Sequence, residues 1–167
     1  KVLGKNVLLD STCTITEGQY LLGPIPLVEN DGVHGMVVKS GTQTLQRGRH
    51  KIQLYWFNGD GAYGLEVYYA GPGLARQLIP NAVLYQLTAE SSADHARWTN
   101  GVNYRVFEGA AWQRLPDFEL LQAVKSGTTT NFNVAVATRP DQVGLEFTTW
   151  IDIPQEGTYT FETSSDD

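Results

Sequence analysis

Residues 48 to 71, GRHKIQLYWFNGDGAYGLEVYYAG, decide the fold class of this chain. Every second residue on either side of a central turn is apolar: Ile52, Leu54 and Trp56 before it, and Leu65, Val67 and Tyr69 after it. This period of two is typical of strands that bury one face. The turn itself, residues 58–61, reads NGDG, and Asn-Gly and Asp-Gly are strong hairpin signals. The stretch predicts two antiparallel strands joined by a short loop.

The same alternation returns along the rest of the chain, between clusters of turn residues. Further strands are predicted at Phe132, Val134 and Val136, at Leu145, Phe147 and Thr149, and at Tyr159 and Phe161. Clusters of turn-forming residues lie at 30–32, 71–73 and 154–157. Only residues 116–124 could make a helical turn or two. Many short strands without intervening helices predict an all-β fold, a sandwich or barrel of antiparallel strands.

Residues 88–100, TAESSADHARWTN, interrupt this rhythm because they are small, polar and non-periodic. Such a composition is typical of a linker. It divides the chain into residues 1–87 and residues 101–167, neither of which is self-evidently a whole domain.

Composition excludes several classes of protein. The 167 residues carry a net charge of −6 and contain no basic run, which argues against a nucleic-acid partner. No stretch approaches 18 consecutive apolar residues, so no membrane insertion is expected. Cys13 is the single cysteine, which excludes a disulfide within these residues. No nucleophile elbow, zinc-protease motif or phosphate-binding glycine loop is present, so we expect that the chain is not an enzyme.

Two groups of short motifs resemble parts of a PA14 domain. The second part of the chain is similar to the opening half of such a domain, on GVNYRVFEG (101–109), LPDF (115–118), GTYTF (157–161) and SSDD (164–167). The first part is similar to the closing half, on NDGVHG (30–35), LQRGRH (45–50), GLEVYY (64–69) and GPG (71–73). The resemblance implies a two-sheet antiparallel β-sandwich in which residues 1–87 form the C-terminal half and residues 101–167 the N-terminal half.

The order of the halves is reversed relative to the family, and two explanations stay open. A circularly permuted single domain would place residues 158–165 near residues 1–10 in one sandwich. Alternatively, the chain contains the tail of one tandem repeat and the head of the next, on separate sandwiches. We favour the permuted domain.

The candidate metal ligands are Asp166, Asp167, Asn58 and Asp60. Adjacent carboxylates repel each other, so a site that keeps both ionised usually supplies a cation. The 58–64 loop offers further oxygens, and its glycines let the backbone turn inward. An acidic turn and a plain hairpin would contain the same residues, so those alternatives stay open.

The resemblance implies a more specific arrangement of these residues. It implies a cis peptide between Asp166 and Asp167, and one calcium ion gripped by this pair and by the loop that carries Asn58 and Asp60. The free positions of the ion would take vicinal sugar hydroxyls. Tyr63, Asp60 and Asp166 are therefore the candidate ligand-binding residues, with the ring of Tyr63 stacking on a sugar.

Other conspicuous side chains are assigned to structure. Trp56 is in phase with Ile52 and Leu54, which predicts a core position. His34 is expected to bond loop backbone, because no nucleophile or acid partner is near it in sequence. Core or inter-sheet positions are expected for Tyr104, Trp112 and Trp150.

The sequence therefore predicts a calcium-dependent carbohydrate-binding module of an extracellular or cell-surface protein, whose partners are a glycan and neighbouring domains. The alternative is a non-catalytic structural or assembly module that packs against neighbouring domains or subunits.

Overall fold

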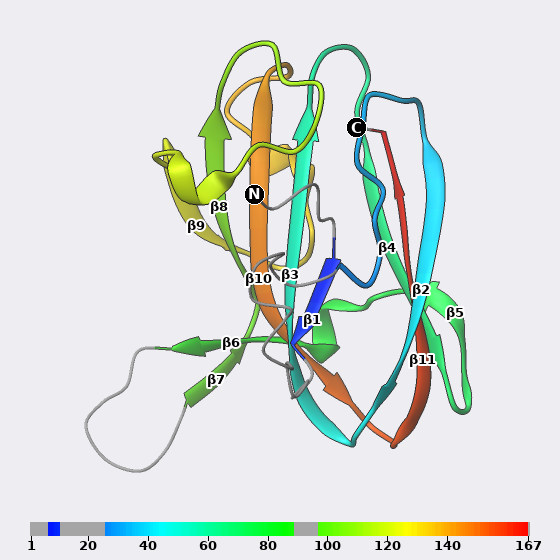
Figure 1. Cartoon of the computed structure of the whole chain (residues 1–167). Helices are drawn as coiled ribbons and strands as arrows, with labels where there is room; N and C mark the ends of the chain where they lie inside the picture. Colours follow the sequence, from blue (N-terminus) through cyan, green and yellow to red (C-terminus); the bar gives the residue numbers. More distant parts are fainter. Residues whose placement is uncertain (1–6, 11–25, 89–96, 167) are drawn as a thin grey trace, which may run out of the picture.

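The computed structural model describes residues 7–10, 26–88 and 97–166, which form a sandwich of two antiparallel sheets (Figure 1). Within these ranges the chain contains strands and short 3-10 turns and no α-helix. The predicted all-β antiparallel sandwich is confirmed.

The first sheet is built around the long central pair β3 (Gly48–Asn58) and β10 (Val143–Ile153), which pair over their full lengths. The other strands of this sheet are β1 (Val7–Asp10), β6 (Leu84–Thr88), β7 (Arg97–Asn100), β8 (Val102–Glu108) and β9 (Lys125–Thr129). β1 pairs with β3, while β6 and β8 both pair with β10 and carry β7 and β9 as outer neighbours.

The second sheet contains β2 (Val37–Leu45), β11 (Gly157–Ser165), β4 (Leu65–Gly71) and β5 (Leu74–Leu78), in that order. The prediction that these strands form a hairpin is wrong: both strands are present, but β3 belongs to the first sheet and β4 to the second, so they do not pair (Figure 1). The 59–64 loop consequently crosses from one layer to the other at one end of the sandwich.

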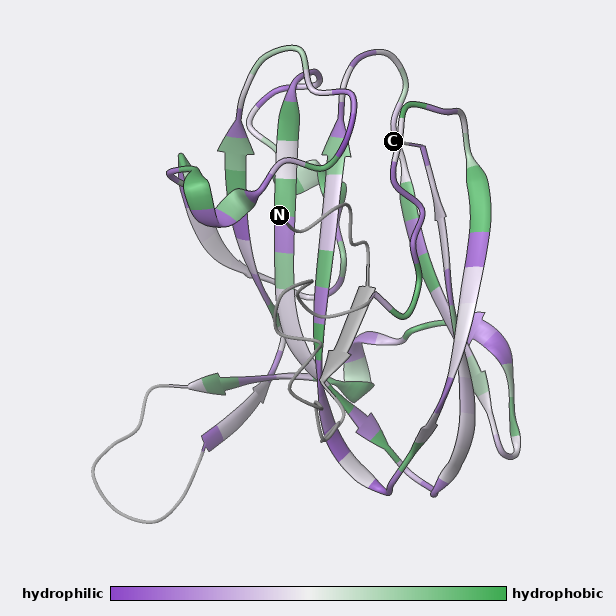
Figure 2. Cartoon of the chain, in the orientation of Figure 1, coloured by the Kyte–Doolittle hydropathy of each residue, from purple (hydrophilic) through white to green (hydrophobic). Residues whose placement is uncertain are grey.

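The inner faces of the two sheets form one core. The predicted alternation is visible as hydrophobic and hydrophilic bands along β3 and β10 (Figure 2). Fully buried members include Leu54, Trp56, Phe147, Tyr159 and Phe161. The core position predicted for Trp56 is confirmed.

Short 3-10 turns replace one predicted strand and account for one predicted helical segment. Phe132 is buried, but Val134–Val136 form the 3-10 turn η4 rather than a strand. The Asn133 side chain accepts a hydrogen bond from Ala135 N at 2.9 Å, which closes this turn locally. The helical turn predicted within residues 116–124 is present as η3 (Phe118–Leu120), and a further turn, η2, covers Asn81–Val83.

Two of the tryptophans predicted for the core lie instead on the outer face of the first sheet. Along β10 the core members are odd-numbered, so Trp150 points outward and is half-buried. Trp112 covers the outer face at Gly144, where an added Cβ would lie 3.3 Å from Trp112 and 2.5 Å from Phe118. Tyr104 does pack against the inter-sheet core.

Strands from both sides of the predicted linker share both sheets, as the β3–β10 and β11–β4 pairs demonstrate. Parts of the predicted linker are strand, because Thr88 ends β6 and residues 97–100 form β7. β1 and β11 lie in opposite sheets of one sandwich, so they are not neighbouring strands. The order of the halves relative to the family stays a prediction.

Candidate functional site

Most of the predicted site residues lie at one end of the sandwich. β3 ends there at Asn58, the 59–64 loop crosses the layers, and β4 begins at Leu65. Leu65 pairs with Ser165 at the end of β11, which brings Asp166 to the same end (Figure 1). The topology therefore gathers residues that are about a hundred positions apart in sequence.

Asp166 is directly connected to this loop. Its side chain is buried to 7% exposure, and one carboxylate oxygen accepts the backbone N–H of Gly64 at 2.5 Å. This charge-assisted bond holds the loop against the end of β11. Asp167, and with it the implied cis peptide, lies outside the described residues.

Asn58 is fully buried at the start of the loop. Its Nδ2 donates to the carbonyl of Pro140 at 2.7 Å and, more weakly, to that of Gly61 at 3.5 Å. Its Oδ1 is buried without a hydrogen-bond partner among the described residues. A buried acceptor without a hydrogen-bond partner destabilises the folded state unless an ordered water or an ion binds to it.

Asp60 and Tyr63 lie further along the same loop. Asp60 is exposed, and Gly61 next to it has φ of +85°, a conformation that suits glycine in a tight loop. Tyr63 is 39% exposed, and its ring centroid lies 5.7 Å from that of the buried Trp56. Tyr63 thus packs partly on the core and keeps part of its ring open to solvent.

Sequence reasoning missed the residue that anchors the loop from outside. Gln142 donates to the carbonyl of Gly59 through its backbone N–H at 3.1 Å and through its Nε2 at 2.8 Å. It adopts φ of +51°, which is unusual for a residue other than glycine, and Arg139 donates to its carbonyl. No local motif signals these contacts, because 83 positions separate Gln142 from Gly59.

A second loop, residues 30–36, joins the same end. Asn30 is 2% exposed and donates to Ser165 Oγ at 3.2 Å and to the carbonyl of Val37 at 2.9 Å. His34 lies with its Nε2 3.2 Å from the carbonyl of Asn30, as expected for a histidine that bonds loop backbone.

Four buried polar atoms lack a hydrogen-bond partner within the described ranges, and all belong to this end of the sandwich: Asn30 Oδ1, Trp56 Nε1, Asn58 Oδ1 and Thr163 Oγ. Three of them are oxygens, and the neighbouring Asp166 adds a carboxylate. Calcium is bound by oxygen ligands, so these atoms are suitable for it. Ordered water would satisfy the same atoms equally well. Among the described side chains, no group of three or more His, Cys, Asp or Glu is arranged to hold a metal.

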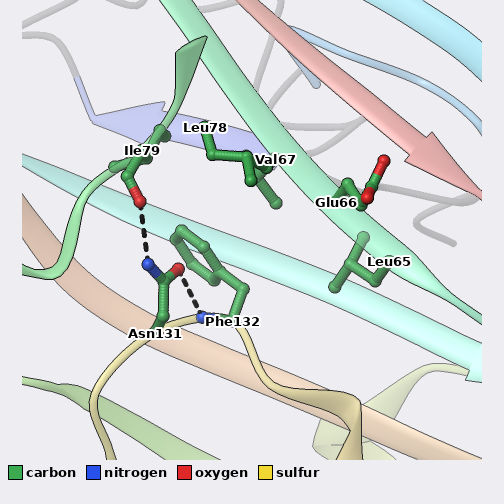
Figure 3. Close-up of a pocket in the computed structure, with 7 residues that line it drawn as sticks. All are labelled: Leu65, Glu66, Val67, Leu78, Ile79, Asn131 and Phe132. Atoms are coloured by element: carbon green, nitrogen blue, oxygen red, sulfur yellow. Dashed lines mark hydrogen bonds between the residues drawn. The ribbon is translucent and has the colours of Figure 1, made fainter.

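A separate hollow of about 210 Å³ lies between β4, the end of β5 and the loop after β9 (Figure 3). Val67, Ile79 and Phe132 give it apolar walls, and Glu66 is its titratable lining residue. Asn131 closes one side by donating to the carbonyl of Ile79 at 2.8 Å. None of the predicted site residues lines it.

Comparisons with protein-family models, curated proteins and solved structures return no match for this chain. Within the described part of the chain, no helix has the length and apolar character needed to cross a membrane.

Proposed function

We propose that this chain is a calcium-dependent carbohydrate-binding module of PA14 type, belonging to an extracellular or cell-surface protein. The observation that carries the proposal is the junction of Asp166 with the 58–64 loop, which begins at Asn58 with its unpartnered buried oxygen. The sequence pattern predicts the same residues as ligands.

Asn58, Asp60, Asp166 and Asp167 would hold the ion. Calcium would neutralise the carboxylates and offer open coordination positions to vicinal sugar hydroxyls. Asp166 also orders the loop through Gly64, so its role includes positioning. Tyr63 offers a partly open ring beside this site for the apolar face of a sugar.

A glycan array run with calcium and with EDTA tests the proposal. We expect calcium-dependent hits with millimolar affinity, about −4 kcal/mol, because a small sugar buries little area and its hydroxyls compete with water. Asp166→Asn should abolish these hits. Asp152→Asn, which makes the same charge change on the outer face of β10, should leave them intact. An array on which EDTA removes no hit, or on which Asp166→Asn leaves the calcium-dependent hits unweakened, would refute the calcium site.

A structural or assembly module is the second candidate. Three large apolar side chains near the start of β2 are more than half exposed: Val33 at 53%, Met36 at 52% and Val38 at 54%. They could pack against a neighbouring domain or subunit. Under this function calcium would raise the unfolding midpoint, yet no glycan on the array would bind.

A further inference from the structure

An aromatic surface lies on the outer face of the first sheet, where the β6–β7 hairpin joins β10. Leu87 is opposite Trp98 in register, and Tyr85 is opposite Trp150, so these side chains share one face. The rings of Trp98 and Trp150 meet edge to face with centroids 5.4 Å apart. Leu87 is 42% exposed beside them, so the surface is open to solvent.

Arg49 reaches this surface from β3. Its guanidinium carbon lies 4.2 Å from the ring centroid of Tyr85 and 4.7 Å from that of Trp98. Two ring contacts fix the plane of the guanidinium. Among the described residues no carboxylate lies within 4 Å of it, so its N–H edges have no acidic partner.

The other stacked arginines behave differently. Arg76 lies 3.8 Å above Tyr68 and is ion-paired with Glu162. Arg105 lies 5.1 Å above Phe107 and makes a two-pronged contact with Glu146. Stacking alone therefore does not explain why the charge of Arg49 is left unpaired.

Basic and acidic residues alternate around Arg49. Lys51 lies two residues along the same face of β3, opposite Asp10 of β1 in register. Asp152 is opposite Arg49 in register, but its carboxylate makes no ion pair with it. The guanidinium of Arg49 is thus held by two rings and has no ion pair among the described residues, which favours an anionic partner.

We propose that Arg49, held between Tyr85 and Trp98, is the anion receptor of a second, calcium-independent binding surface that takes a carboxylate-bearing polysaccharide. A pre-oriented guanidinium matches a carboxylate with two parallel hydrogen bonds. The apolar side chains of Trp98 and Leu87 lie beside it for the C–H faces of the sugar rings. Because Leu87 is exposed among the described residues of this sheet face, an extended chain can lie across it and present successive carboxylates.

Binding of tetragalacturonate in EDTA, measured by calorimetry, tests the proposal and separates it from any calcium site. We expect binding that rising salt weakens, with no binding of neutral maltotetraose. Arg49→Gln should raise Kd at least about tenfold. Lys51→Gln, which touches neither ring contact, should raise it roughly two- to threefold.

Arg76→Gln is the matched control, because it also removes a ring-stacked arginine and the same net charge. It should change Kd less than about twofold, since Glu162 already pairs that charge. Near-ultraviolet circular dichroism checks that Arg49→Gln leaves the tryptophan packing intact. The proposal is overturned if the wild type does not bind, if Arg49→Gln and Arg76→Gln weaken binding equally, or if Lys51→Gln has no effect. If poly-glutamate bound as tightly as tetragalacturonate, the proposed partner would be an acidic peptide and not a polysaccharide.

Discussion

Replacing Asn58 with aspartate tests whether Asn58 is a metal ligand or only a structural amide. The substitution keeps the shape of the side chain and exchanges Nδ2, which donates to the carbonyl of Pro140 at 2.7 Å, for an oxygen. Without calcium, two oxygens would face each other in a fully buried position. The lost bond and the unsatisfied buried acceptor together should cost about 2–4 kcal/mol of unfolding free energy. For a domain of this size that corresponds to an unfolding midpoint lowered by roughly 5–15 °C.

Calcium should offset part of this loss, because Asn58→Asp should gain more stability from the ion than the wild type does. Asn58 Oδ1 is an unpartnered oxygen, and a carboxylate in its place would be a stronger ligand for a hard cation. Calcium at a hundred times its Kd stabilises the folded state by about 2.7 kcal/mol. We therefore expect a larger calcium-induced rise of the midpoint in Asn58→Asp than in the wild type.

Thermal unfolding in EDTA and across a calcium series provides the assay. Asn58→Leu is the control, because it has a similar volume and no oxygen. It should lose stability in EDTA as Asn58→Asp does, and its midpoint should hardly respond to calcium. An equal calcium response in all three proteins would refute the reasoning and leave Asn58 as a loop anchor.

Two further predictions concern stability alone. Gly71→Ala should cost about 1–3 kcal/mol, because its Cβ would lie 2.3 Å from the ring of the fully buried Tyr159, whereas Gly35→Ala, with nothing within 4 Å, should be nearly neutral in urea unfolding. Burial, with a smaller contribution from Glu146, raises the pKa of Tyr55 to about 12. The folded state thus holds this proton to higher pH than the unfolded state, and stability that is present below about pH 10 should fall as the pH rises from about 10 to 12. Tyr55→Phe should flatten that slope, and an unchanged slope would contradict the assignment.

Most of the fold prediction rests on the alternation of apolar and polar side chains along the strands. β3, β4, β10 and β11 each follow an alternation that was legible in the sequence. Along β10, Trp150 is out of step with the buried Leu145 and Phe147, so the alternation itself predicts that Trp150 faces outward. Its large ring had suggested a core position instead. Residues 132–136 alternate as a strand would, but the Asn133 side chain stabilises a 3-10 turn there. Local polar bonds outweighed the pattern at that point.

The site was only partly predictable because its members are joined by long-range contacts. The NGDG turn and the aspartate pair are local signals, from which the sequence predicts one site. The bonds that fix the loop, from Gln142 to Gly59 and from Asn58 to Pro140, cross more than eighty positions. Such pairings depend on sheet register, which the sequence pattern left open. Arg49 was missed for the same reason, since its ring partners lie on β6 and β7.

The two proposed surfaces can be tested independently because β3 carries them at opposite ends and on opposite faces. Asn58 points into the sandwich at the end of the strand, and Arg49 points outward near its beginning. Nine residues of strand separate them, which corresponds to about 30 Å. At that separation substitutions with no shared partners act additively. Loss of calcium binding in an Asn58 variant therefore carries no information about Arg49, and EDTA, which would empty the first surface, leaves the chemistry of the second unchanged.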